Sequence, residues 1–198
     1  MDFLYHFAQT SPRLMPVYAF IFGLITIDYG IILLGIFSFI NIIINLIIKF
    51  FFKKLYGYLK VKRLPILGIG ERPSGICNNN MDYGYFNEYL NIKDAKMFGM
   101  PSGHSQNAWF VFTFLVLYLI DKYKSFKSSK SYPSYQLKLM KKWIMYTIIF
   151  LLMMTIFISY SRVKVNCHTK EQVILGGILG IIFGFIFYKI YKIIINYL

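Results

Sequence analysis

The sequence predicts an all-α membrane protein: a single domain, residues 1–198, folded as a polytopic helical bundle of about five spans. Two observations support this prediction. Hydrophobic residues make up 57% of the chain and its mean hydropathy is +0.54, which is too apolar for a soluble domain of 198 residues. These residues also fall into runs long enough to cross the hydrocarbon core of a bilayer as helices, with polar segments between them.

The charge of the chain indicates which partners it meets. Lys and Arg number 22 against 8 Asp and Glu, which gives a formal net charge of +14. The cations interrupt apolar runs and do not form a continuous basic face, so no nucleic-acid partner is expected. Membrane lipids with anionic headgroups, or other phosphate groups, are the partners that this distribution favours.

The first apolar run extends from Leu14 to Phe52, and as one helix it would be about 58 Å long, twice the thickness of the hydrocarbon core. We therefore predict two spans, at about 14–27 and 31–52, joined by a tight turn at Asp28–Gly30. The first of these is short, and a half-inserted interfacial helix is its alternative.

Polar residues recur every four positions near the end of the second span. Asn41, Asn45 and Lys49 therefore lie on one face of the helix. Hydrogen bonding between helices, with a snorkelling lysine, explains such a stripe. A phosphate site at the membrane surface is the other interpretation.

Three further spans are predicted downstream. Because successive spans cross the bilayer in opposite directions, the two catalytic loops are expected at one membrane face. A Lys-rich connection is expected on the other face, solvated and without a chemical role. The spans are 104–120, 143–160 and 172–197, the catalytic loops are 53–103 and 161–171, and the connection is 121–142. In the last span, Gly176, Gly180 and Gly184 recur every four residues, which predicts close packing against another helix.

The segment Pro101-Ser102-Gly103-His104 stands where a polar loop gives way to an apolar run. Such a junction has the features of an anion site, because Ser102 can cap a helix and Gly103 lets backbone N–H groups approach a ligand. His104 adds a titratable group beside them. Taken alone, the tetrapeptide is equally compatible with a capped helix start and an incidental histidine.

Basic and histidine side chains from several segments are predicted to meet at this face. Two arginines, a lysine and the neutral donors of a helix start suit phosphate oxygens and neutralise a phosphoryl group in its transition state. Two histidines allow one to attack phosphorus and the other to protonate the leaving oxygen. The nearby acids Glu71 and Glu171 are isolated in the sequence, so we expect phosphoryl transfer through a phosphohistidine without a metal or other cofactor. The candidates are Lys49, Arg72, Ser102, Gly103, His104, Arg162 and His168.

The order of these motifs resembles the three-part signature of the type-2 phosphatidic acid phosphatase superfamily. The parts are a lysine with Arg72-Pro73, then Pro101-Ser102-Gly103-His104, then Ser161-Arg162 followed by His168. The strings around them, Phe98–Gln106 among them, are most similar to the dolichyl-diphosphate phosphatase branch. This resemblance implies a helical, multi-pass membrane enzyme that removes the terminal phosphate of a polyprenyl diphosphate without a metal. It implies an endoplasmic-reticulum-type membrane if the enzyme is specific for dolichyl lipids.

The resemblance also implies a role for each candidate. By matching positions, His168 is the nucleophile and His104 the general acid. The phosphate cradle consists of Lys49, Arg72, Ser102, Gly103 and Arg162.

Two positions depart from the family pattern. Where the broad superfamily has an aspartate four residues after the second histidine, this chain has Gln172, an amide that can orient an imidazole but supplies no charge unless Glu171 helps. The dolichyl branch tolerates glutamine there. The lysine is also farther from Arg72 than is usual, so Lys49 is preferred on its register with the asparagines and Lys62 is the competitor.

Other interpretations stay open. A phosphatase for phosphatidic acid or a related phospholipid would use the same residues, and the two departures favour a catalytically silent lipid-phosphate binder. The lysines of the 121–142 connection favour a lumenal site, whereas those at 53–63 favour the reverse. A disulfide between Cys77 and Cys167 would tie the two catalytic loops together if that face is oxidising.

Overall fold

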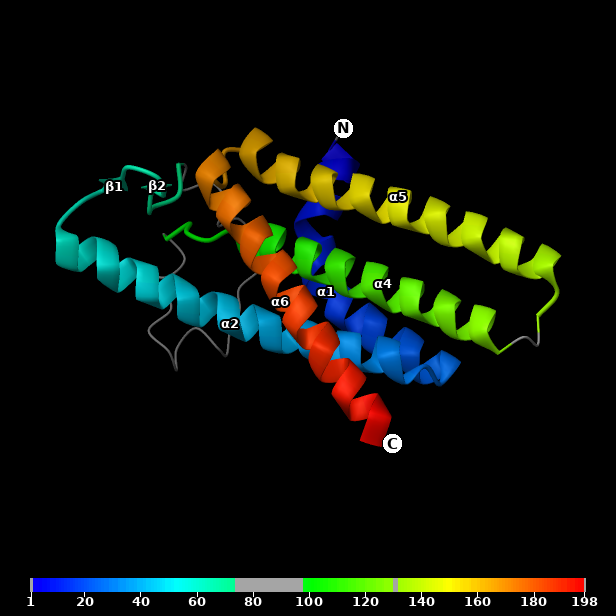
Figure 1. Ribbon diagram of the computed structural model, residues 1–198. Helices are drawn as coiled ribbons and strands as arrows, with labels where there is room; N and C mark the ends of the chain where they lie inside the picture. Colours follow the sequence, from blue (N-terminus) through cyan, green and yellow to red (C-terminus); the bar gives the residue numbers. More distant parts are fainter. Residues whose placement is uncertain (1, 74–97, 130–131, 198) are drawn as a thin grey trace.

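The computed structural model describes residues 2–73, 98–129 and 132–197, without the side chains of 2–9 and 11–13 (Figure 1). The described part contains five helices, which confirms the predicted all-α fold, and adds one two-stranded antiparallel hairpin. The elements are α1 (Asp2–Thr26), α2 (Tyr29–Leu59), β1 (Arg63–Leu64), β2 (Gly68–Ile69), α4 (Gly103–Ser128), α5 (Ser134–Lys164) and α6 (Lys170–Tyr197).

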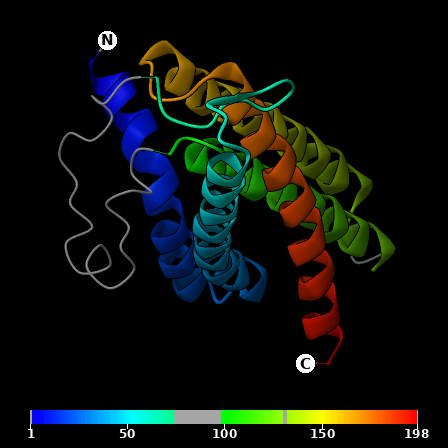
Figure 2. The same cartoon turned by 90° about the vertical axis from the view of Figure 1, so that its left-hand side faces the viewer.

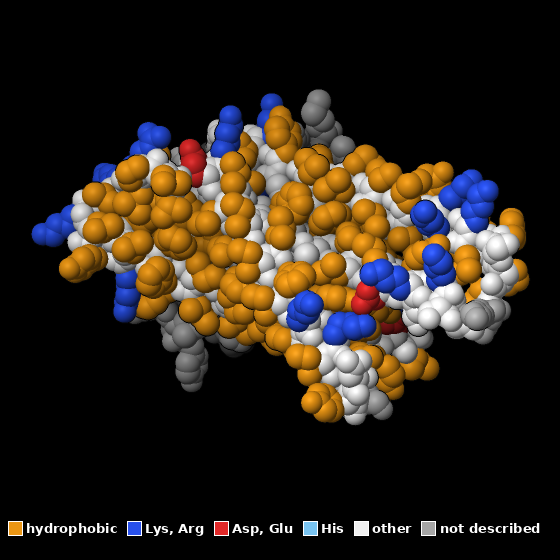
Figure 3. Space-filling view, viewed as in Figure 1, with side chains coloured by type: hydrophobic (Ala, Val, Ile, Leu, Met, Phe, Trp, Pro, Cys, Tyr) orange, Lys and Arg blue, Asp and Glu red, His pale blue; other side chains and the backbone are white. Residues whose placement is uncertain are grey.

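Helices α2, α5 and α6 are long and apolar enough to cross a membrane, and Leu14–Thr26 of α1 is a shorter apolar stretch. Helix α4 differs from them because its first two turns are polar and Asp121 and Lys122 follow its apolar part. Figure 3 shows hydrophobic side chains over the middle of the molecule and Lys and Arg side chains gathered toward its ends. This distribution is the one expected of a multi-pass membrane protein.

The helices extend beyond the predicted apolar spans. Helix α2 continues past Phe52 to Leu59, and α1 begins well before Leu14. The expectation of a long polar connection at 121–142 was wrong in form, because α4 runs to Ser128 and α5 already begins at Ser134. Lysine and leucine are good helix formers, so these helices continue where the chain stops being apolar.

Helix α4 lies at the centre of the bundle and packs against α2, α5 and α6. Its aromatic residues Phe110 and Phe114 are fully buried and form a core with Phe37 of α2 and Tyr188 of α6. The glycine stripe of α6 packs closely against another helix, as predicted, and that helix is α4: a Cβ at Gly184 would lie 2.8 Å from the carbonyl oxygen of Phe110. Only hydrogen side chains allow the two backbones to approach this closely.

The bundle has two polar ends. At one end lie the α1–α2 turn and the ends of α4 and α5 that are joined to each other; at the other lie the hairpin, the start of α4 and the α5–α6 turn (Figure 1). Figure 2 looks along the bundle from the second end and shows α1 and α6 on opposite sides of α2. The second end therefore collects the segments in which the candidate residues were predicted.

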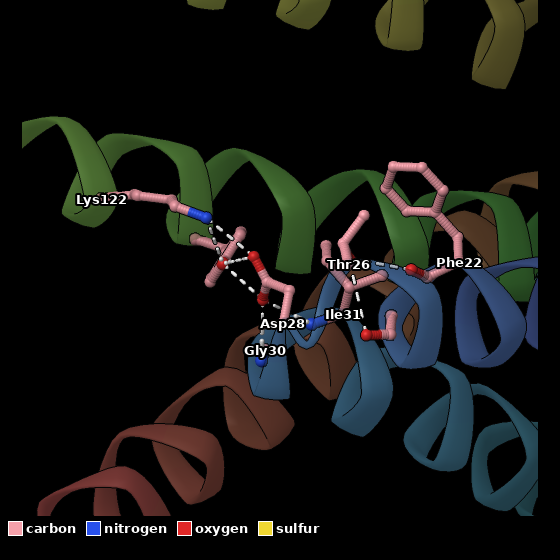
Figure 4. A network of polar contacts seen from close by, with 8 residues as sticks. Phe22, Thr26, Asp28, Gly30, Ile31 and Lys122 are labelled. Carbon is pink, nitrogen blue, oxygen red and sulfur yellow. Dashed lines mark hydrogen bonds and ion pairs between the residues drawn. The ribbon is translucent and has the colours of Figure 1, made fainter.

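The first end is held by Asp28 (Figure 4). Its Oδ1 atom accepts hydrogen bonds from the N–H groups of Gly30, at 3.0 Å, and Ile31, at 3.2 Å, and so caps α2. Its Oδ2 atom accepts from Lys122 Nζ at 2.7 Å and from the hydroxyl of Tyr118 at 2.6 Å, which joins the α1–α2 turn to α4. Burial opposes ionisation of Asp28, but the hydrogen bonds from Lys122 and Tyr118 outweigh it and hold the pKa of this carboxyl below its ordinary value.

Candidate active site

The last turn of α5 and the turn that follows it fix the backbone of His168. Asn166 has a left-handed φ of 52°, which ends the helix. The N–H group of Asn166 donates to the carbonyl of Val163, and that of Cys167 to the carbonyl of Arg162, both at 3.0 Å. This pair of bonds is a Schellman motif. The N–H of His168 also donates to the carbonyl of Arg162, at 3.1 Å, so the motif holds these two candidates at a fixed separation.

Helix α6 begins immediately after His168 with a capping box. The N–H group of Gln172 donates to Oγ1 of Thr169 at 3.4 Å, and the N–H of Thr169 donates back to Oε1 of Gln172 at 3.3 Å. The sequence Thr169-Lys170-Glu171-Gln172 has the spacing that this motif requires. The same Gln172 that starts the helix is therefore held beside His168.

The amide of Gln172 determines which nitrogen of His168 carries a proton. Its Nε2 atom donates to the carbonyl oxygens of Ile69, at 2.8 Å, and Glu71, at 2.9 Å, and since carbonyls only accept, the orientation of the amide is fixed. Oε1 then faces Nδ1 of His168 at 3.0 Å. Because Oε1 can only accept, Nδ1 carries a proton, and in the neutral imidazole it is then Nε2 that keeps the lone pair. We call this set of hydrogen bonds the amide clasp.

The amide clasp joins the two loops that were predicted to be catalytic. Ile69 and Glu71 flank Gly70 just before Arg72, and Gln172 follows His168, so one side chain ties the Arg72 segment to the nucleophile candidate. Gly99 lies against the same amide, because a Cβ at Gly99 would be 2.7 Å from Cδ of Gln172. The N–H of Gly99 donates to the carbonyl of Gly70 at 2.8 Å.

His168 is buried, with 3% of its surface exposed, and lies among cations. Burial lowers its pKa well below the ordinary value, and the charges of Lys49 and Arg72 lower it further, followed by His104; the hydrogen bond to Gln172 acts in the opposite direction. The structure thus brings these three predicted site residues, which belong to α2, the loop after β2 and α4, close to one imidazole. Burial and these neighbouring charges thus disfavour the protonated form of His168.

Ser102 and Gly103 begin α4 at the same end. Ser102 occupies the N-cap position, yet its side chain makes no capping hydrogen bond, and its buried Oγ has no hydrogen-bond partner in the structure. The expectation that this serine could serve as an ordinary helix cap is therefore not met. Its N–H donates to the carbonyl of Gln172 at 3.0 Å, which places the start of α4 against the first turn of α6. A buried hydroxyl at a helix N-terminus suits an anion.

The two asparagines of the α2 stripe bind other helices. Asn45 Nδ2 donates to Oε1 of Gln106 at 2.7 Å, and Gln106 Nε2 donates to Oδ1 of Asn41 at 2.9 Å. Asn41 Nδ2 in turn donates to Oδ1 of Asn107 at 3.1 Å. This buried chain of amides fixes the register of α2 against α4 and so determines where the next residue of the stripe, Lys49, lies.

The placement of the lysines separates the two candidates. Lys49 is buried, with 7% exposed, and its charge acts on His168. Lys62 is exposed and lines a surface pocket of about 380 Å³ with Glu71 and Phe98. The structure thus supports Lys49 over Lys62 as the lysine next to the site. Arg162 is also buried, with 4% exposed, and its Nε donates to the hydroxyl of Ser161 at 3.2 Å.

Sequence reasoning missed several features of the site. The carbonyl groups of Ile69 and Glu71 carry no signal in the sequence, because every residue has one. Glu171, considered as a helper of His168, instead lies against the hairpin, where a Cβ at Gly68 would be 3.2 Å from its Cδ. Cys167 is buried and disulfide-bonded, as predicted, and Cys77, the chain's other cysteine, lies outside the described residues. Among the described residues, no group of three or more His, Cys, Asp or Glu is placed to hold a metal ion.

Comparisons with known proteins match one family over most of the chain. The family model of the PAP2 superfamily matches residues 28–195. Dolichyldiphosphatase 1 of Dictyostelium discoideum is 33% identical over 93 residues, which are 47% of this chain and 35% of that protein. Dolichyldiphosphatase 1 of Homo sapiens is 39% identical over 85 residues, 42% of this chain and 32% of that protein. The match thus spans about a third of the length of these curated relatives. No solved structure matches the chain.

Proposed function

Because the chain belongs to the PAP2 superfamily, we propose that it is an integral membrane phosphatase that removes the terminal phosphate of a polyprenyl or dolichyl diphosphate through a phosphohistidine. The observation that carries this proposal is the state of His168. It is a buried imidazole whose Nδ1 faces Oε1 of Gln172, and the charges of Lys49 and Arg72, which come from separate elements, act on it and lower its pKa. A nucleophile placed among cations suits an anionic electrophile.

The phosphate cradle consists of charged and neutral donors from different elements. Arg72 and Arg162 supply planar guanidinium groups that match phosphate oxygens, and Lys49 adds a point charge. Ser102 supplies a buried hydroxyl, and Gly103 a backbone N–H at the start of α4, where the helix dipole favours negative charge. These groups would stabilise the charge on the equatorial oxygens of the phosphoryl group in the transition state.

Phosphoryl transfer then takes place in two steps. In the first, Nε2 of His168 attacks the terminal phosphorus, the bond to the bridging oxygen breaks, and His104 donates a proton to that oxygen, which releases polyprenyl monophosphate. In the second, His104 accepts a proton from water as that water attacks the phosphohistidine. The nitrogen–phosphorus bond breaks, inorganic phosphate leaves, and both histidines return to their starting states.

The lipid substrate is proposed from the relatives and from the position of the site. The relatives carry the name dolichyldiphosphatase 1. The site lies at one end of a bundle whose middle is covered by hydrophobic side chains (Figure 3), so a diphosphate could bind at the membrane surface while its isoprenoid chain stays among lipid-facing helices. With a dolichyl lipid as substrate, the enzyme would belong in an endoplasmic-reticulum-type membrane.

Phosphate release from the purified protein in detergent, in the presence of a chelator, tests this function. We expect release from polyprenyl diphosphate and its loss in His168→Ala. Faster release from phosphatidic acid would favour a phospholipid phosphatase. Binding of the diphosphate without turnover by the unmodified protein would favour a silent lipid-phosphate binder.

A matched pair of variants tests the lysine of the cradle. Lys49→Met should lower kcat/KM strongly, because a buried cation is lost beside the transferred phosphate, whereas Lys62→Met removes an exposed one and should leave it near the original value. A larger fall of kcat/KM in Lys62→Met than in Lys49→Met would show that Lys62 is the lysine of the phosphate cradle.

A further inference from the structure

Helix α2 is longer than a membrane is thick. Its 31 residues span about 46 Å, whereas the hydrocarbon core measures about 30 Å. The twenty residues that separate Tyr29 from Lys49 already cover that thickness, about 30 Å. With Tyr29, which follows the charged Asp28, placed at one edge of the hydrocarbon, the rest of α2 and the hairpin after it lie beyond the hydrocarbon on the face that holds the candidate site. Figure 1 shows this end of α2 extending past the other helices, with β1 and β2 beside it.

This extension combines cations with exposed apolar side chains. We call residues 50–69 the basic collar. It contains no Asp or Glu, and its cations are Lys53, Lys54, Lys60, Lys62 and Arg63. Three of its apolar residues are strongly exposed: Phe51 by 63%, Tyr58 by 86% and Ile66 by 89%. Lys54 Nζ lies 4.7 Å from the centroid of the Phe50 ring, so a cation and an aromatic ring share one surface.

Exposing the apolar side chains of the basic collar to water is unfavourable, and so is placing its charged side chains in hydrocarbon. The headgroup layer of a membrane suits both, because lipid phosphates pair with Lys and Arg while aromatic and aliphatic side chains reach the first carbons of the acyl chains. An acidic protein surface would match the charges but would leave Phe51 and Ile66 exposed. The composition therefore favours a lipid surface over a protein partner.

We propose that the basic collar binds the headgroup layer of an anionic bilayer leaflet at the face of the candidate site. The collar contributes directly to that site, since Ile69 of the hairpin accepts a hydrogen bond from Gln172 at 2.8 Å. The hydroxyl of Tyr56 donates to the carbonyl of Gly68 at 3.0 Å and so holds the hairpin on α2. Anionic lipid would thus contact the hairpin, and the hairpin carries Ile69, one of the hydrogen-bond acceptors of the amide clasp. The interaction itself does not depend on the proposed activity.

Quenching of a tryptophan by brominated lipid tests the proposal without an activity assay. The reporter is Ile66→Trp at the most exposed apolar position of the collar, in a full-length background carrying Trp109→Phe and Trp143→Phe. The protein is reconstituted into vesicles of phosphatidylcholine brominated near the glycerol end of its chains, with or without phosphatidylglycerol. We expect quenching that increases about twofold when the anionic lipid is present.

Two charge variants of the reporter protein complete the test. Replacing Lys54, Lys60, Lys62 and Arg63 by Gln should abolish the increase. The matched control replaces Lys127, Lys138, Lys141 and Lys142, exposed at the other end of the bundle, and should retain it. Absence of quenching, or equal quenching in neutral and anionic vesicles, would overturn the proposal, as would an equal effect of the two sets. Elution as a single species in detergent shows that each variant is folded.

Discussion

The amide clasp predicts that position 172 requires an amide and not a carboxylate. In Gln172→Glu the side chain keeps its length and one oxygen can still face His168, but the NH₂ group that donates to the carbonyls of Ile69 and Glu71 becomes an oxygen. The new charge beside the imidazole would raise the basicity of the nucleophile. The same negative charge would repel the two carbonyl oxygens that now accept hydrogen bonds from Gln172, and this would weaken the link to the Arg72 segment. The two effects have opposite signs, so the direction of the change in activity decides between them.

The lost hydrogen bonds outweigh the gain in charge. Each of the two lost hydrogen bonds costs about 1 kcal/mol, or about 2 kcal/mol together, because Ile69 and Glu71 are exposed residues and water can partly satisfy their carbonyls. Gln172 itself is completely buried, with 0% exposed, so the new carboxylate oxygen cannot turn away from these carbonyls toward water. At about 1.4 kcal/mol for each factor of ten, a loss of about 2 kcal/mol corresponds to a rate factor of about 30. We expect kcat/KM to fall by at least this factor, because the segment that carries Arg72 is released from His168.

Phosphate release measured over a range of substrate concentrations gives the required kcat/KM. Gln136→Glu, the same chemical change at an exposed position of α5, is the matched control and should behave as the unmodified protein. Thermal unfolding in the same detergent separates a damaged site from a smaller folded fraction. Activity of Gln172→Glu at or above the unmodified level would refute this reasoning, since charge at the imidazole would then matter more than the bonds to the loop.

The pH profile of kcat/KM should have its acid limb well below pH 6.5, because burial and neighbouring cations lower the pKa of His168 and its attacking form is unprotonated. Lys49→Met removes one of these cations and should move that limb to higher pH, and an unmoved limb would argue against the electrostatic account. Gly99→Ala should lower kcat/KM, since the new Cβ would lie 2.7 Å from Cδ of the clasp glutamine, whereas a Cβ in Gly57→Ala meets no atom within 4 Å and should have no effect; equal kinetics for the two would contradict this. Asp28→Asn should lower the free energy of unfolding by about 1–2 kcal/mol, because it weakens the cap of α2 and the hydrogen bonds to α4, and kcat per folded molecule should not change. An unshifted thermal unfolding midpoint in detergent would show that the end of the bundle at the α1–α2 turn needs no carboxylate.

Much of the architecture could be predicted because a bilayer restricts what a chain can do. Runs of apolar residues must form helices there, and their alternation placed the segments around Arg72 and His168 at one end before any contact was known. The glycine stripe predicted the close approach of two helices because a missing side chain has a direct steric consequence. The asparagine stripe was harder to interpret. Its spacing indicated a shared face but left open whether the amides of Asn41 and Asn45 bind another helix or a ligand.

The sequence carried less information about the chemistry of the site. The acceptors of the amide clasp are main-chain carbonyls, so nothing in the identity of Ile69 or Glu71 reveals them. The side chain of Ser102 has the composition of a helix cap, and only the three-dimensional arrangement leaves its hydroxyl without a bond. Helix ends were also misjudged, because lysine-rich turns continue a helix as readily as apolar ones. Interactions with main-chain atoms and the absence of an expected bond are thus the features that required coordinates.

Phosphorylation of His168 during turnover is the central claim, and mass spectrometry of the quenched enzyme tests it most directly. The His104→Asn variant is mixed with polyprenyl diphosphate, quenched in alkali to preserve the nitrogen–phosphorus bond, and digested. Polyprenyl monophosphate can leave without a proton from His104 more easily than water can attack without losing a proton to it, so the second step slows more than the first and the intermediate should accumulate in this variant. The account predicts a phosphoryl group on the peptide that contains His168, and its absence when His168→Ala is added. Turnover with phosphate on another residue, or undiminished turnover in His168→Ala, would contradict it.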